Sequence, residues 1–240
     1  MDGSKIAANV SVNKMDFNYN GALKHYIQLG TVMTDKAYRN QGLIRRIMRE
    51  IEADFAGQTD GFYLFANDSV LDFYPKFGFE KTEEYRCWKE IEQTGERTAV
   101  QVPMEEKRSW NKLEEAIHTS IPNGSFEMLG NSSLIMFYIT KSMRENVFYI
   151  ESLDAYIIAE LEKETLYLDN IYAKQKVNIN DVIKAFGSSV KKVVLNFTPL
   201  DTGGFHVELL KQEGLTLFVR GEDIKELCQR KLMFPELSHA

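Results

Sequence analysis

The sequence has few cysteines and few prolines. Its only two cysteines, Cys87 and Cys228, belong to no Cys-x-x-Cys pair and lie at no metal-ligand spacing from a histidine. We therefore predict neither a disulfide framework nor a metal site, and a reducing cytoplasmic compartment. Five prolines and 44% hydrophobic residues are typical of a chain that buries a core, which argues against extensive disorder.

Basic residues are not in excess. The 29 Lys and Arg residues are outnumbered by 35 Asp and Glu residues, giving a formal net charge of −6. Proteins that bind nucleic acid neutralise phosphates with a basic surface, so this balance argues against a nucleic-acid partner and favours a cationic or small-molecule one. No apolar run approaches the roughly 20 residues of a membrane-spanning helix, so we expect no membrane partner.

The first part of the chain alternates strands with a helix. Period-2 alternation from Ile6 to Val12 and an extended run from Tyr26 to Thr34, with a turn cluster at 18–21 between them, predict an antiparallel hairpin. A polar loop at 35–42 follows. Apolar residues spaced by three and four from Leu43 to Ile51 then predict a helix.

The remaining elements extend this order. We expect a buried strand at 62–66, a helix at 67–77 and an extended stretch from residue 78 to about 91. Beyond a polar linker, the same order returns. The second series comprises helices at 110–121, 134–138, 180–186 and 205–212, and strands at 147–151, 155–161, 166–173, 193–197 and 215–219. The prediction is an α/β fold with mixed sheets, divided into a domain at 1–95, a linker at 96–107 and a domain at 108–240.

The loop before the first helix has the features of a phosphate site. Gly42 stands at the helix N-terminus, where backbone N–H groups and the helix dipole favour an anion, and Arg39 and two further arginines lie nearby. One glycine is a weak signal. On this segment alone, a plain loop ending in a helix N-cap would be preferred.

Two motifs change that balance. Arg39-Asn40-Gln41-Gly42 resembles the R/Q-x-x-G-x-G/A loop of the GNAT superfamily of acetyltransferases, with Ile44 where Gly or Ala is usual and a branched side chain can crowd the phosphates. Asn67 followed by Tyr74-Pro75-Lys76-Phe77-Gly78-Phe79 is similar to a second GNAT motif. The resemblance covers about residues 5–91. The Arg-x-x-Gly-Leu variant resembles the enhanced intracellular survival proteins, which contain two fused GNAT-like units.

The resemblance implies acetyl-CoA as cofactor and a role for each matching residue. Backbone N–H groups near Val32, Met33 and Thr34 would bind the acetyl carbonyl and the pantetheine arm. Asn67 would hydrogen-bond that arm, and Tyr74 would donate a proton to the departing sulfur. The pyrophosphate would lie on the backbone of Arg39, Asn40, Gln41, Gly42, Leu43 and Ile44.

The implied function is an acetyl-CoA-dependent N-acetyltransferase that transfers acetyl directly to a primary amine of a small molecule or peptide. The alternative is a non-catalytic CoA- or acyl-CoA-binding sensor or assembly protein with the same fold. The general base is not readable from the sequence. The candidates by type and position, each expected to be a solvated surface group, are His25, Asp68, Glu80, Glu83 and Glu84.

The second unit lacks the marks of the first. No glycine precedes its helix between residues 172 and 180, and Leu210 stands where Tyr74 stands in the first unit. We expect a degenerate copy that binds no cofactor in the usual way, and instead completes the acceptor cleft or mediates assembly, as in a homo-oligomer. By the resemblance, the first unit also starts without the family's N-terminal strand and helices. A longer native chain, a second chain or the second unit would then cover the acceptor site, and a bare edge at 6–12 would favour association.

Overall fold

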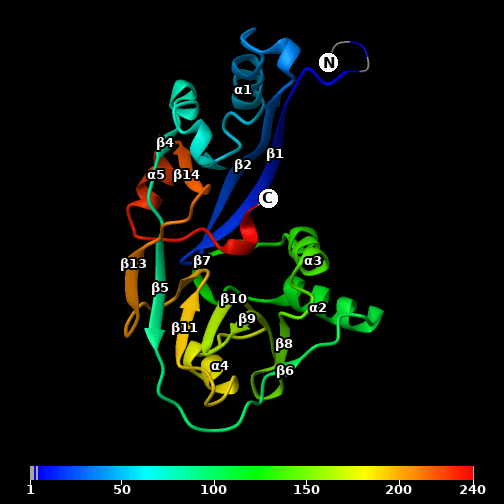
Figure 1. Ribbon diagram of the computed structural model, residues 1–240, viewed down its shortest axis with the longest axis vertical. Coiled ribbons are helices and arrows are strands. Elements are labelled where there is room, and N and C mark those ends of the chain that lie inside the picture. The colour runs from blue at the N-terminus through cyan, green and yellow to red at the C-terminus, as the bar shows by residue number, and fades with distance from the viewer. Residues whose placement is uncertain (1–2, 4, 240) are drawn as a thin grey trace.

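The fold consists of two seven-stranded mixed sheets (Figure 1). The computed structural model describes residue 3 and residues 5–239; the ends of the two predicted domains at residues 1, 2, 4 and 240 lie outside them. The first sheet contains, in spatial order, β12 (Thr198–Pro199), β7 (Gly124–Leu129), β1 (Ala8–Tyr19), β2 (Ala22–Thr34), β3 (Gly61–Ala66), β14 (Thr216–Arg220) and β4 (Glu80–Lys81). The second contains β13 (His206–Leu209), β5 (Tyr85–Glu90), β11 (Lys192–Leu195), β10 (Thr165–Ala173), β9 (Ala155–Glu162), β8 (Val147–Ile150) and β6 (Val100–Gln101).

The predicted hairpin is confirmed and is longer than its alternation indicated. β1 and β2 pair antiparallel from Tyr19–Ala22 outward, so two residues of the predicted turn cluster belong to a strand. The turn itself is Asn20-Gly21, with φ of 48° and 92°. Positive φ at both central residues matches the right-handed twist of paired strands, which is why Asn-Gly closes this hairpin.

Five α-helices lie outside the sheets in the described residues. They are α1 (Leu43–Asp54), α2 (Lys107–Thr119), α3 (Ser132–Lys141), α4 (Ile179–Ala185) and α5 (Glu222–Cys228). The first four confirm predicted helices, whereas α5 and β7 were not predicted. Ile44, Met48 and Ile51 of α1 are buried against one face of the first sheet.

Two predicted helices are wrong. Residues 67–77 form two short 3-10 helices, η2 (Asp68–Val70) and η3 (Tyr74–Phe77), because Asn67 caps the first turn and Gly78 ends the second at φ 79°. Residues 206–209 form the edge strand β13, which pairs with β5. This tertiary pairing overrides the helical spacing that suggested 205–212.

The two sheets exchange strands across the predicted linker. β5, from before residue 96, lies in the second sheet between β11 and β13. β7, β12 and β14, from beyond residue 107, lie in the first sheet. The two units are therefore interlocked, while the residue numbers that bound them as domains stay a prediction.

An aromatic cluster fills the space between the sheets. Phe17 and Phe126 stack at 4.6 Å between ring centroids, and Phe234 lies 4.9 Å from Phe126 and 4.5 Å from Tyr63. Phe234 belongs to the segment 232–239, drawn in red between the sheets in Figure 1. Among the described residues, no helix is long and apolar enough to cross a membrane.

Candidate active site

The first sheet opens between β2 and β3. The two strands pair in parallel from Tyr26–Gly61 to Gln28–Tyr63 only. β2 then runs on to Thr34 and β3 to Ala66, each held on its other side by β1 or β14. The two arms beyond Gln28 and Tyr63 therefore turn backbone N–H and C=O groups toward a gap between them.

A bulge lies on the β2 arm of this opening. Between the pairs Asn9–Met33 and Ser11–Gly30, β2 has two residues where β1 has one, and Thr31 has a φ of 45°. The extra residue of a bulge has no ladder partner, and the bulge bends its strand. The predicted segment Val32–Thr34 thus begins at an irregularity that can direct backbone N–H groups at a ligand.

The predicted glycine loop connects this arm to α1. Gly42 is the helix N-cap with φ 72°, and no side chain caps the helix. The first bond of the helix runs from Arg46 N–H to the Gly42 carbonyl at 3.1 Å, so the amides before Arg46 precede the helical ladder. Asn40 also has positive φ, at 63°. This is the helix N-terminus that an anion such as pyrophosphate requires.

Two hollows extend from the loop along α1. One of about 440 Å³ is lined by Gly42 and the arginines Arg45, Arg46 and Arg49. Another, of about 520 Å³, includes Gln41 and Leu43. Arg39 lies at the loop itself, with Nε 3.5 Å from the Thr34 carbonyl. Glu50 also lines both hollows and pairs with Arg46 at 3.0 Å, so the positive charge near the loop comes from the exposed Arg39, Arg45 and Arg49.

Ile44 does not point into the loop mouth. Its side chain is 8% exposed and packs in the core beneath α1, with Ile27 and Leu29 of β2. The side chain therefore leaves the backbone of the loop open, although the family pattern has Gly or Ala there.

Asn67 lies at the far end of β3. Its Oδ1 accepts a hydrogen bond from the Ser69 backbone N–H at 3.2 Å, as the cap of η2. The amide oxygen is thus engaged locally, while no contact of the amide nitrogen with a described residue is observed. Only the Nδ2 donor is available to a ligand in this rotamer.

Tyr74 lies on the α1 side of β3. It is 7% exposed, and its ring contacts Phe73, Phe79 and Phe218 at 5.4, 6.3 and 5.7 Å between centroids. Its hydroxyl makes no hydrogen bond to a described residue. Burial raises the pKa of Tyr74, so the phenol keeps its proton at neutral pH.

Comparisons with known proteins agree with this geometry. Residues 1–82 match the acetyltransferase (GNAT) domain family. The resemblance to the GNAT superfamily is confirmed. No curated protein sequence matches the chain.

Solved structures extend the GNAT-like fold over nearly the whole chain. A probable N-acyltransferase from Enterococcus faecalis V583 has a TM-score of 0.58 at 17% identity, covering 91% of this chain and 59% of its own. A GCN5-related N-acetyltransferase from Kribbella flavida has a TM-score of 0.55 at 16% identity, and the match covers 93% of this chain and 60% of that structure. Eis1 from Mycobacterium abscessus has a TM-score of 0.55 at 12% identity, and the match covers 94% of this chain and 63% of that structure. At these identities the likeness shows the fold, two GNAT-like units, and the chain spans about three fifths of these structures' length.

The general-base candidates do not converge on the opening. His25 Nδ1 lies 2.7 Å from Asp16, Glu80 pairs with Lys225 at 2.7 Å, and Glu83 accepts the Tyr85 hydroxyl at 2.9 Å. Asp68 accepts the Gly214 N–H at 3.3 Å. All four carboxylate and imidazole groups are exposed or half-buried, as predicted for them.

Glu84 corrects the prediction of a solvated group. It is 7% exposed, and its carboxylate accepts the Phe234 N–H at 2.9 Å. Burial, together with nearby Glu236, raises the pKa of Glu84 to about 8. No signal in the sequence marks Glu84 for burial, because the segment that covers it is about 150 residues away along the chain.

The second GNAT-like unit has a similar opening, and the end of one arm is bonded to the segment before β7. β10 and β11 pair in parallel only as far as Leu168–Leu195. Along the remaining arm, Ala173 donates its N–H to Ser120 Oγ at 3.0 Å and accepts the Ile121 N–H at 2.9 Å. The Ser120 hydroxyl and the Ile121 N–H therefore satisfy both backbone groups of Ala173 within the chain, while the absence of cofactor binding in this unit stays a prediction.

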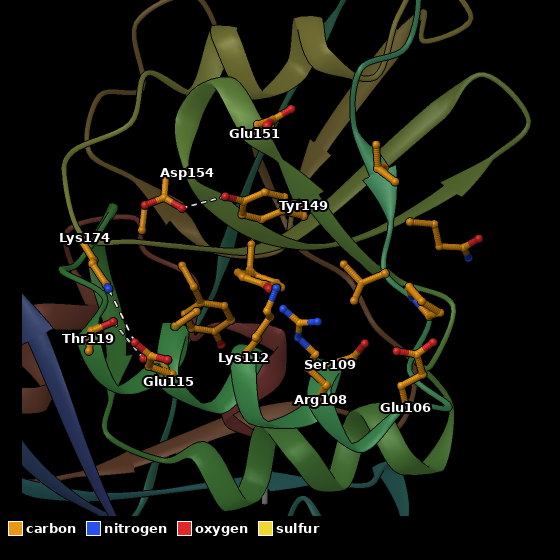
Figure 2. A pocket seen from close by; sticks show the side chains of 18 of the residues that line it. Glu106, Arg108, Ser109, Lys112, Glu115, Thr119, Tyr149, Glu151, Asp154 and Lys174 are labelled. Atoms are coloured by element: carbon orange, nitrogen blue, oxygen red, sulfur yellow. Dashed lines mark hydrogen bonds and ion pairs between the residues drawn. The ribbon is translucent and has the colours of Figure 1, made fainter.

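A further hollow lies in the second unit, away from the predicted site. It has a volume of about 650 Å³ between α2 and the second sheet. In Figure 2, Arg108 and Lys112 rise from α2 into the hollow, and the Tyr149 hydroxyl donates to Asp154 at 2.8 Å. Sequence analysis did not predict this hollow, because no motif marks its lining residues.

Proposed function

We propose that the chain is an acetyl-CoA-dependent N-acetyltransferase that transfers acetyl directly to a primary amine of a small molecule or peptide. The observation that carries the proposal is the opening between β2 and β3, which leads from the uncapped N-terminus of α1 to the face where Tyr74 lies. The match of residues 1–82 to the GNAT domain supports acetyl transfer in general.

The donor groups of the β2–β3 opening and the α1 loop fit acetyl-CoA. The backbone of Arg39–Ile44 would hold the pyrophosphate at the α1 N-terminus, where the arginines of the flanking hollow add positive charge. Backbone groups of Val32, Met33 and Thr34 would bind the pantetheine amides and the acetyl carbonyl. Nδ2 of Asn67 would donate to the same arm. When bound, the cofactor supplies the activated thioester.

The residues of this chain then provide the charge stabilisation and the proton. N–H groups on the β2 arm would stabilise the negative charge that develops on the carbonyl oxygen as the amine attacks. The Tyr74 phenol, kept protonated by burial, would donate its proton to the leaving sulfur. No covalent link to the protein is needed.

The test is an acetyl-transfer screen with purified protein against polyamines, aminoglycosides and lysine peptides, read as release of free thiol. We expect turnover with at least one class of primary amine. Thiol release that is the same with and without every amine would contradict the proposal.

A second function, a non-catalytic CoA or acyl-CoA sensor, is favoured by one observation. Asn67 uses its amide oxygen to cap η2, which is a structural role. Measuring both acetyl-CoA binding and acetyl transfer distinguishes the two functions. Binding of acetyl-CoA without transfer to any amine would favour the sensor, and transfer would exclude it.

A further inference from the structure

The segment 232–239 is fixed between the two sheets. The Leu232 carbonyl accepts the Tyr85 N–H at 2.8 Å, and the Phe234 N–H donates to Glu84 at 2.9 Å. The Glu236 N–H donates to the Asn196 carbonyl at 3.0 Å. These bonds join the segment to both sides of the interface, so its side chains are held in place.

His239 is positioned by this segment against the β3 arm. Its ring lies 3.8 Å from the Phe65 ring, at an interplanar angle of 31°. Phe65 is beyond the last β2–β3 pair, so it belongs to the wall of the opening. The Tyr138 hydroxyl of α3 donates to the His239 carbonyl, which holds the residue from its other side.

The imidazole has one nitrogen without a partner. His239 Nε2 is buried and makes no hydrogen bond within the described residues. The ring does bond to the backbone of Phe234, in a way that favours its protonated form. That bond therefore uses the Nδ1–H as donor, which assigns the lone pair of the neutral ring to Nε2.

The ring is also kept neutral. Burial lowers the pKa of His239, and the charge of Glu236 and the bond to Phe234 only partly oppose this effect. A buried acceptor without a donor costs free energy, so such a nitrogen calls for an explanation by a ligand or a water molecule. An amine N–H is a donor of the required kind.

Tyr74 and His239 lie on opposite faces of β3. Leu64 and Ala66 point to the α1 face of β3, where Tyr74 packs. Tyr63 and Phe65 point to the inner face, where His239 packs. The opening beside β3 is where the sheet is interrupted between these two faces. A thioester held there would face a proton donor on one side and a proton acceptor on the other.

We propose that His239 is the general base of the transfer, a role that rests on the proposed function. The acceptor nitrogen forms a bond to the carbonyl carbon and loses one proton to His239 Nε2. The carbon–sulfur bond breaks with its electron pair on sulfur, and Tyr74 supplies the proton that makes the free thiol. The products are an amide and CoA, and the two proton transfers balance.

The titratable groups around His239 come from three elements. Glu236 lies on its own segment in the 3-10 helix η5 (Glu236–Ser238), and Tyr138 comes from α3. Tyr63 of β3 lies close by, with its ring against Phe65 and Phe234. Burial raises the pKa of both tyrosines, so their phenols stay protonated and neutral beside His239 at neutral pH.

The test uses His239→Gln with His206→Gln as the matched control. His206 is exposed on β13 and stacks on Trp88, at the edge of the second sheet. We expect His239→Gln to lower kcat by roughly 100-fold or more without changing KM for acetyl-CoA. Wild type should lose kcat/KM as pH falls below 6.5, and this acidic limb should disappear in His239→Gln but persist in His206→Gln. Imidazole in the buffer should partly restore the rate of His239→Ala.

The outcomes separate the two proposals. If wild type transfers acetyl and His239→Gln retains its rate and its acidic limb, His239 is not the base while the transferase function stands. If wild type binds acetyl-CoA but acetylates no amine, both proposals fall. Equal losses of rate in both variants, with melting temperatures lowered alike, would assign the effect to folding and overturn the role of His239.

Discussion

At the residue scale, Tyr74 offers the most direct chemical test. The Tyr74→Phe variant removes a hydroxyl that bonds to no described residue and keeps the ring contacts with Phe79 and Phe218. We therefore expect little change in stability, an acetyl-CoA affinity close to that of wild type and a transfer rate lower by roughly 100-fold. Steady-state kinetics measures the transfer rate, and calorimetry measures the affinity for acetyl-CoA. A variant as fast as wild type would remove Tyr74 from the reaction.

Glu84 predicts a pH-dependent stability. Its pKa is about 8 in the fold against an ordinary 4.5, so the folded state binds more protons between these values and loses stability as pH rises through them. Glu84→Gln removes this dependence and can still accept the Phe234 N–H. As pH rises, the free energy of unfolding of Glu84→Gln should therefore increase relative to that of wild type, by up to about 1.4 kcal/mol per pH unit.

Urea unfolding at pH 5.5, 7 and 8.5 measures that difference. Glu83→Gln is the control, because Glu83 is exposed and, among the described residues, its carboxylate accepts a hydrogen bond from the nearby Tyr85 hydroxyl alone. Parallel stability curves for wild type and Glu84→Gln would contradict the expected ionisation of a buried carboxyl.

Sequence reasoning found some residues of the site and missed others for a physical reason. Asn67 and Tyr74 belong to motifs with fixed local spacing. Glu84 and His239 are indistinguishable in the sequence from solvated residues, because contacts between distant segments bury them. Ile44 was correctly identified as unusual, but its direction into the core depended on the placement of α1 over the sheet.

At the element scale, strong periodicity predicted well and weak periodicity did not. The β1–β2 hairpin and α1 were predictable because each has a regular apolar pattern and a distinct turn or glycine at its end. β13 is an exposed edge strand, so no buried face sets its period. β7 begins at Gly124, shortly after the predicted helix at 110–121, and its pairing with β1 could not be read locally.

The N-terminus of α1 gives the prediction for an element. Gly42→Ala forces a side chain into positive φ, which should cost about 1 kcal/mol of stability, and it also places a methyl group beside the proposed pyrophosphate site. Gly204→Ala is the matched control, since Gly204 has φ 78° and, like Gly42, open space around it. Both should melt at similar temperatures, but only Gly42→Ala should bind acetyl-CoA more weakly, by roughly tenfold. Equal affinities would contradict the assignment.

At the scale of the whole molecule, strand exchange predicts a single folding unit. The second sheet needs β5 from the first half, and the first sheet needs β7 and β14 from the second. Urea unfolding followed by far-UV circular dichroism and by the fluorescence of Trp88 and Trp110 should therefore give coincident transitions. Two separated transitions would show that the units unfold independently.

The exchange also limits what the sequence could reveal. The repeated order of elements indicated two units, and two GNAT-like units are present. Composition and turns along the chain contain no information on which sheet a strand joins, so the interlocking of the two sheets was not predictable from local patterns.

The central claim is that one opening of the molecule, between β2 and β3, binds acetyl-CoA. Isothermal titration calorimetry of the full chain with acetyl-CoA tests it most directly, because the β10 arm of the second opening is already bonded at Ala173 to the Ser120 hydroxyl and the Ile121 N–H. The account predicts binding with one cofactor per chain. Absence of binding at millimolar cofactor, or two equivalent sites per chain, would contradict it.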